Sequence, residues 1–120
     1  DAVVDSDDAV GIGDDAVAML RELLRIDTSN HGDDSGPGEI EAARWAVAKL
    51  AEVGIEAELF STTATHRAGV SAFLPGVQSD REPLLLTGHL DVVPADPAGW
   101  THPPFSGHLD DEGVVWGRGA

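Results

Sequence analysis

Cysteine is absent from this chain, and positively charged residues are few. Without cysteine the chain can form neither a disulfide framework nor a thiolate metal site. Only 7 Lys and Arg stand against 22 Asp and Glu, which gives a formal net charge of −15. A surface of that charge repels polyanions, so nucleic acids and anionic membrane surfaces are excluded as partners.

Long apolar runs are missing as well. No run approaches the roughly 20 residues that cross a bilayer, and the first residues lack the basic start and apolar stretch of a secretory signal. We therefore expect a cytoplasmic protein without a membrane partner. Hydrophobic residues make up 42% of the 120 residues, which is enough for the core of one small domain or of part of a larger one.

Two helices are predicted in the first half of the chain. Apolar residues recur at spacings of three and four from about residue 15 to 26, and again from residue 37 or 38 to 53. Gly54 is placed to end the second helix in a left-handed conformation. Residues 1–14 hold acids and small residues without a basic one, so we expect a flexible acidic tail there and a folded portion over 15–120.

Strands are predicted after the helices. Residues 55–59 alternate between apolar and acidic, as a half-exposed strand does, and residues 70–74 and 114–116 form two further short strands. Residues 84–87 do not alternate, so we expect a central strand that is covered on both faces. This order of elements predicts an α/β fold with the helices packed on a mixed sheet.

The sharpest chemical feature follows the apolar strand. His89 comes at the strand's end, where α/β folds bind their ligands, and a neutral imidazole is a common zinc ligand. Asp91 lies two residues later and can accept the other ring N–H of His89 or of a neighbouring ligand, which fixes the tautomer. Gly88 leaves room for a metal and a substrate. Taken alone, the tripeptide also fits a loop histidine that is hydrogen-bonded to a nearby carboxylate.

The wider context resembles a known family. Residues 84–94, LLLTGHLDVVP, are similar to the first metal-binding signature of the zinc metallopeptidase family of aminoacylase-1, acetylornithine deacetylase, succinyl-diaminopimelate desuccinylase and glutamate carboxypeptidase. Residues 99–105, GWTHPPF, resemble its Trp-x-x-x-Pro-Phe segment, and residues 116–120, WGRGA, resemble the lead into its second metal signature. Residues 24–30, LRIDTSN, resemble the end of its first helix, so the likeness covers about 15–120.

The resemblance implies a hydrolase that cleaves the amide bond of N-acyl amino acids or short peptides. It implies two zinc ions per subunit, with Co²⁺ as a substitute. His89 matches a histidine that ligates one zinc, and Asp91 matches the active-site acid that orients this histidine. We expect the N-terminal part of a zinc-peptidase-like catalytic domain, with helices on a mixed, mostly parallel sheet.

Other parts of the family's site have no counterpart in the sequence. The resemblance would place the bridging Asp ligand at the second residue after Ala120, and the general-base Glu and the remaining ligands later still. The small lid domain, which such enzymes often use to form a homodimer, is absent too. We therefore expect the isolated fragment to be inactive, because catalytic zinc takes three protein ligands.

The remaining histidines have no paired spacing such as His-x-x-x-His. We expect them to be exposed or hydrogen-bonded loop residues rather than metal ligands; they are His31, His66, His102 and His108. Trp100 and Phe105 are expected to anchor their proline-rich loop to the core rather than to touch substrate. Arg118 could pair with an acid or hold the loop that follows it. Residues 110–113 lack the ligand spacing of a calcium loop, which favours a solvated hairpin turn.

Two alternatives to this enzyme stay open. One is a non-catalytic acidic binding domain or a metal-dead relative, which the residues following Ala120 would distinguish. The other is a different zinc aminopeptidase family that also uses a His-x-Asp after a central strand. Residues 99–105 and 116–120 argue against this second alternative.

Overall fold

The computed structural model describes residues 6–61, 64, 66–78 and 80–120. The chain divides into two compact units, one formed by the residues up to Asp27 together with Pro94–Ala120, and the other by Thr28–Val93. Helix α1, Ser6–Leu24, belongs to the first unit, and helix α2, Ile40–Glu52, belongs to the second. Neither described helix is long and apolar enough to cross a membrane.

Helix α1 begins well before the predicted residue 15. Residues 6–14, which were predicted to belong to a flexible tail, are helical, and residues 1–5 of that tail lie outside the described residues. Once a helix has formed, each added residue brings one more hydrogen bond, which offsets part of the cost of about 1 kcal/mol that a helical glycine such as Gly11 or Gly13 carries relative to alanine. The helix ends close to the predicted residue 26, with Arg25 and Ile26 donating to carbonyls three residues back.

Helix α2 confirms the predicted helix and its end. Gly54 has a φ of +75°, and its N–H donates to the carbonyl of Ala51 while that of Ile55 donates to the carbonyl of Leu50. This pair of bonds is the glycine-terminated cap that satisfies the last helical carbonyls. The helix begins at Ile40, later than predicted, because Gly38 has a φ of +70°, which no helical residue adopts.

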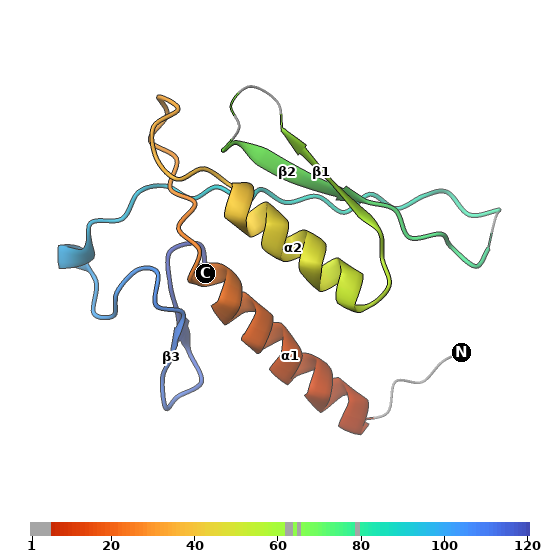
Figure 1. Cartoon of the computed structure of the whole chain (residues 1–120). Coiled ribbons are helices and arrows are strands. Elements are labelled where there is room, and N and C mark those ends of the chain that lie inside the picture. Colours follow the sequence, from red (N-terminus) through yellow and green to blue (C-terminus); the bar gives the residue numbers. More distant parts are fainter. Residues whose placement is uncertain (1–5, 62–63, 65, 79) are drawn as a thin grey trace. The chain divides into compact units, whose positions relative to one another are not determined.

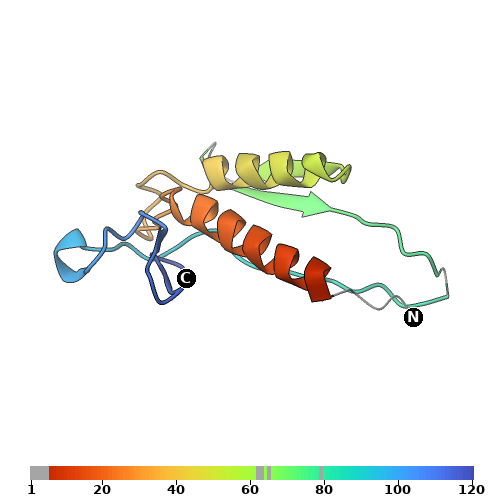
Figure 2. The same ribbon diagram turned by 90° about the horizontal axis from the view of Figure 1, so that it is seen from below.

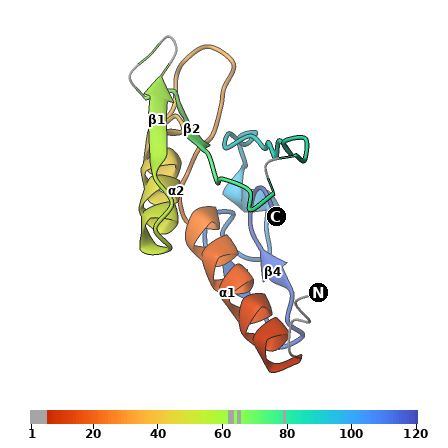
Figure 3. The ribbon, with the colours of Figure 1, turned by 90° about the vertical axis from the view of Figure 1, so that its right-hand side faces the viewer.

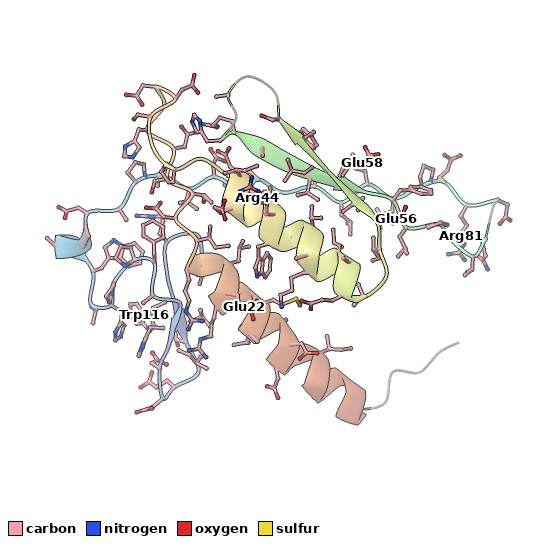
Figure 4. All side chains as sticks on the ribbon, in the orientation of Figure 1. Glu22, Arg44, Glu56, Glu58, Arg81 and Trp116 are labelled. Atoms are coloured by element: carbon pink, nitrogen blue, oxygen red, sulfur yellow. The ribbon has the colours of Figure 1, made fainter. Side chains whose placement is uncertain are left out.

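Helix α2 packs against an antiparallel hairpin of strands β1, Ala57–Ser61, and β2, Ala68–Ala72 (Figures 1 and 2). Ala42 and Ala43 are fully buried. Ala51, in the last turn of the helix, is exposed. Glu58, labelled in Figure 4, is exposed on β1, in agreement with the acidic face of a half-exposed strand.

The predicted central strand differs most from expectation. Leu84, Leu85 and Leu86 belong to no helix or strand and are 83–84% exposed. Within the described residues, both sheets are antiparallel hairpins, and the isolated bridge between Ser29 and Val92 is parallel. Coverage of the three leucines on both faces is thus wrong for the described part of the chain, because no described element packs over them. The mostly parallel sheet stays a prediction.

The first unit ends in a second hairpin beside α1 (Figure 3). Strand β3, His108–Leu109, pairs with β4, Val115–Trp116, after a short 3₁₀ turn at Pro97–Gly99. The hairpin turn at 110–113 confirms the prediction, and Asp110 organises it by accepting hydrogen bonds from the N–H groups of Glu112 and Val114.

Two arginines at the end of α1 hold this part of the chain, Arg21 in the last helical turn and Arg25 directly after the helix. Arg21 donates to the carbonyl of Gly107 at 2.9 Å, and Arg25 donates to that of Ser106 at 3.1 Å. Leu24 is buried against the backbone at Gly117, where an added Cβ would lie 2.9 Å from a leucine methyl carbon. Glycine at 117 thus lets the chain pass close over the helix end.

Candidate functional site

The site lies where residues 28–30 run beside residues 90–92 in the second unit. The Val92 N–H donates to the Thr28 carbonyl at 3.2 Å, and the Asn30 N–H donates to the Val92 carbonyl at 2.8 Å. The Thr28 hydroxyl adds a bond of 2.7 Å to the Leu90 carbonyl. This parallel pairing fixes the backbone on both sides of Asp91.

The His89 ring is oriented by the residue two positions later. Its Nδ1 lies 3.0 Å from Oδ1 of Asp91 and 2.7 Å from the Asp91 carbonyl oxygen. Because both oxygens can only accept from it, Nδ1 carries the hydrogen, and a neutral ring keeps its lone pair on Nε2. The side chain is 82% exposed, so Nε2 is accessible to a ligand. Of the two predicted acceptor roles for Asp91, the structure shows the bond to His89.

Asn30 holds the other oxygen of the same carboxylate. Its Nδ2 donates to Oδ2 of Asp91 at 2.8 Å, and its Oδ1 accepts from the Gly32 N–H at 2.9 Å. The hydrogen bond from Asn30 is the main cause that lowers the pKa of Asp91 below its usual value; burial opposes it, and the bond from His89 adds to it. The carboxylate is therefore held in its charged form.

A pocket of about 390 Å³ opens beside these residues. His89 and Asp91 line it on one side, and residues of α2 and the β1–β2 hairpin line the other. A second hollow of about 310 Å³ also has both residues in its wall, together with Asn30. A Cβ at Gly88 would meet no atom within 4 Å, which agrees with the predicted room at that position.

Glu39 is a buried acid in the wall of the larger pocket that the sequence did not reveal. Its side chain is 8% exposed, and Oε2 accepts from Arg67 at 3.0 Å and from the Ala68 N–H at 3.3 Å. Its Oε1 is buried without a hydrogen-bond partner among the described residues. The ion pair ties the start of α2 to the hairpin and places a guanidinium in the pocket wall.

His89 and Asp91 fit one ligand position of a metal site. His89 offers an accessible Nε2 and has a carboxylate on its other nitrogen, as metal-binding histidines do. Within the described residues, however, no three His, Asp or Glu side chains lie together in a way that could hold a metal ion. The described residues therefore offer one candidate ligand with a carboxylate on its other ring nitrogen, and no closed zinc site.

His31 lines the smaller hollow together with His89 and Asp91, whereas His66, His102 and His108 form contacts of their own. His66 Nε2 lies 3.1 Å from the Asp34 carbonyl oxygen, as expected of a hydrogen-bonded loop residue. His102 and His108 stack with ring centroids 3.9 Å apart, and His102 also meets the ring of Trp116 edge-on. Figure 4 labels Trp116 on β4. The stacked pair was not predicted from the sequence, since the five residues between the two histidines give no local signal for the contact.

Arg118 packs on its loop. Its guanidinium carbon lies 5.0 Å from the centre of the Trp100 ring, and the backbone N–H of Arg118 donates to the Pro104 carbonyl at 2.7 Å. Arg118 thus contacts the loop of residues 99–105 that precedes it, and its role toward the loop that follows it stays a prediction, as does the anchoring of Trp100 to the core.

Comparison with known proteins gives a family match and several relatives. Residues 85–120 match the model of peptidase family M20/M25/M40. The chain is 74% identical over 34 residues to a succinyl-diaminopimelate desuccinylase of Paracoccus denitrificans, covering 28% of this chain and 9% of that protein. It is 30% identical over 105 residues to aminoacylase-1 of Sus scrofa, covering 88% of this chain and 25% of the relative.

A third relative has a different named activity. A Beta-Ala-Xaa dipeptidase of Lactobacillus delbrueckii subsp. lactis is 34% identical over 107 residues, which cover 84% of this chain and 21% of that protein. The chain thus spans a quarter or less of the length of these three relatives.

Proposed function

Since this chain is a relative of the M20/M25/M40 peptidases and carries their pattern over residues 85–120, we propose that it is part of a zinc-dependent hydrolase. The reaction is cleavage of the amide bond of N-acyl amino acids or short peptides. The predicted resemblance to the family is confirmed by the comparisons. The observation that carries the proposal is His89, whose Nδ1 is bonded to Asp91 and whose Nε2 is exposed beside a pocket.

His89 would hold the zinc ion through Nε2, and the Asp91 carboxylate would make the ring a stronger ligand by accepting the Nδ1 hydrogen. Zinc, when bound, supplies Lewis acidity toward the amide carbonyl and makes water a stronger nucleophile near neutral pH. Two zinc ions per subunit, with Co²⁺ as a substitute, are part of the proposal. The further ligands and the general base would come from the rest of the whole protein.

The pocket walls suit a small substrate. A volume of about 390 Å³ lies in the range of small-molecule sites. Arg67 brings a partly exposed guanidinium to the wall, which can attract a carboxylate such as that of an N-acyl amino acid. The charge of −15 works against polyanionic substrates. The same proposal includes a cytoplasmic location and dimerisation through a lid domain. It also holds that the protein binds neither nucleic acid nor membranes.

The names of the relatives support this substrate class. A desuccinylase, an aminoacylase and a dipeptidase share one reaction type, the hydrolysis of an amide bond next to an amino-acid unit. The resemblance assigns no substrate-selecting residue to this chain. The proposal therefore names a class of substrate.

Hydrolysis assays of the whole protein test the proposal. With zinc present, the protein should release amino acids from N-acetyl amino acids or from dipeptides. Treatment with a chelator should abolish the release, and added Zn²⁺ or Co²⁺ should restore it. A zinc-loaded whole protein that cleaves none of these amides would contradict the proposal and favour the alternative of a non-catalytic acidic binding domain.

A further inference from the structure

We propose that Asn30 is a positioning residue that acts through Asp91 to hold the His89 ring in its metal-binding orientation. The inference rests on the proposed function, because it gives Asn30 a task in that same site. Asn30 would touch neither metal nor substrate. Its effect passes through the one carboxylate that both side chains contact.

The contacts of Asn30 leave its amide one orientation. Nδ2 faces Oδ2 of Asp91 at 2.8 Å, and Oδ1 faces the Gly32 N–H at 2.9 Å. Turning the amide over would set an oxygen against the carboxylate and an NH₂ group against an N–H donor. The side chain therefore serves Asp91 as a donor, and it serves its own loop as an acceptor.

The backbone fixes where this donor stands. The Asn30 N–H donates to the Val92 carbonyl at 2.8 Å, and Ser29 forms the parallel bridge with Val92. The chain on both sides of the Asn30–Asp91 contact is thus paired, although the two residues lie 61 positions apart in the sequence. A donor placed on a paired backbone is preorganised for its acceptor.

The His89 ring depends on that acceptor. Both hydrogen bonds of the ring that the described structure contains go to Asp91, one to its carboxylate and one to its carbonyl. The ring is 82% exposed, so packing restrains it little. If Oδ2 loses its bond to Asn30, the Asp91 carboxylate can rotate about its side-chain torsion, and Oδ1 no longer stays opposite Nδ1. The imidazole then samples other orientations and the other tautomer.

Two substitutions separate the task of Asn30 in its loop from its task at Asp91. Asn30→Asp keeps the size of the side chain and an oxygen for the Gly32 N–H, but it replaces the donor to Asp91 by a second carboxylate. The exchange Asn30→Asp with Asp91→Asn restores a donor and an acceptor across the contact with their places reversed. If Asn30 only shaped its loop, Asn30→Asp would behave as the unchanged protein does.

Thr28→Val provides the matched control. It removes the 2.7 Å bond from the buried Thr28 hydroxyl to the Leu90 carbonyl in the same backbone pairing, and it keeps nearly the same volume. Its cost should appear in stability, and the tautomer of His89 should stay unchanged.

The measurements use the whole protein with ¹⁵N-labelled histidine. Metal-free samples at about pH 8, where histidine is neutral, report the tautomer of His89, and titration with Zn²⁺ alone reports affinity. We expect the Nδ1–H tautomer in the unchanged protein and in Thr28→Val, and a mixture of tautomers in Asn30→Asp. Zinc affinity in Asn30→Asp should fall by about 10- to 100-fold, the range for partners of metal ligands, and the exchange should recover part of it.

The outcomes separate the two proposals. An unchanged tautomer and unchanged zinc affinity in Asn30→Asp would overturn the role of Asn30, even if the protein hydrolyses amides. An Nε2–H tautomer in the unchanged protein would overturn it too. A protein that hydrolyses no amide, but whose His89 tautomer and zinc affinity respond as expected, would contradict the proposed function and leave the positioning by Asn30 supported.

Discussion

At the scale of single residues, two acids in the pocket wall have different tasks. Asp91 engages both carboxylate oxygens, one with His89 and one with Asn30, so it holds a ring in place. Glu39 engages Oε2 with Arg67 and leaves Oε1 without a hydrogen bond in the described structure. The first acid orients the His89 ring, and the second joins the start of α2 to the β1–β2 hairpin.

The buried ion pair of Glu39 with Arg67 should contribute more to the free energy of unfolding than the exposed pair of Glu41 with Arg44. Glu39→Ala removes a charged acceptor from Arg67 and from the Ala68 N–H, and we expect the free energy of unfolding in urea to fall by about 1.5–3 kcal/mol. The control is Glu41→Ala, which breaks the exposed pair with Arg44 and should cost less than about 1 kcal/mol. Equal losses for both variants would show that burial does not strengthen the Glu39 pair.

Sequence spacing predicted the local part of the site and missed the rest. His89 and Asp91 lie two residues apart, so an extended backbone alone brings them together. Asn30 reaches Asp91 across 61 residues, and Glu39 reaches the Ala68 N–H across 29. Contacts of that separation depend on how the segments pair in the fold. In the sequence, Asn30 was recognisable only as a turn-forming residue within a motif that resembles a helix end.

At the scale of helices and strands, the sequence predicted the helix end that a particular residue type sets. It did not predict the strand ends that the register between two strands sets. Gly54 predicted the end of α2, because other residues avoid the left-handed conformation that Gly54 adopts. The hairpin strands occupy Ala57–Ser61 and Ala68–Ala72 instead of the predicted 55–59 and 70–74. Their bounds follow from the register between the two strands, which apolar alternation leaves open.

Gly54→Ala should weaken the end of α2. A residue with a Cβ pays about 1 kcal/mol or more for the left-handed conformation at φ +75°, although no atom lies within 4 Å of the added carbon. Gly99→Ala is the control, since it also has open space and its φ is not positive. Urea unfolding should show a loss for the first variant and none for the second. A loss in both would place the cause elsewhere than in the backbone conformation.

The β3–β4 hairpin should loosen in acid. The Asp110 carboxylate accepts from Nε1 of Trp116, and this bond is the main cause that lowers the pKa of Asp110 below 3.8, with the bond from the Val114 N–H next. Because the folded-state pKa is the lower one, the contribution to stability is complete above the unfolded value and is lost as the pH falls through the folded value.

NMR of the Trp116 indole N–H can follow this loss. The signal should shift below about pH 4, the ordinary range of an Asp carboxyl, and Asp110→Asn should remove most of the pH dependence. A Trp116 signal that moves equally in Asp110→Asn would point to a different titrating group.

At the scale of the whole molecule, the class of fold was predictable and the sheet was not. The described chain combines two helices with two antiparallel hairpins, in agreement with an α/β class. The apolar pattern of Leu84, Leu85 and Leu86 indicated coverage on both faces, but they are 83–84% exposed. A pattern shows that side chains are fit for burial, whereas burial itself requires elements that pack on them.

The 120-residue chain by itself should show no amidase activity. His89 is the one ligand that we propose for this chain, and no group of three metal-binding side chains occurs in the described part of the chain. Catalytic zinc needs three protein ligands and an open position. The assay is amino-acid release from N-acetyl amino acids with added Zn²⁺, and the whole protein is the positive control. Zinc-dependent turnover by the short chain would contradict this description of the site.

The zinc content of the His89→Ala variant of the whole protein tests the central claim most directly. His66→Ala is the matched control, because His66 is a hydrogen-bonded loop histidine outside the site. Elemental analysis should find one zinc ion fewer per subunit in His89→Ala than in the unchanged protein, and full zinc content in His66→Ala. Unchanged zinc content in His89→Ala would contradict the assignment of His89 as a metal ligand.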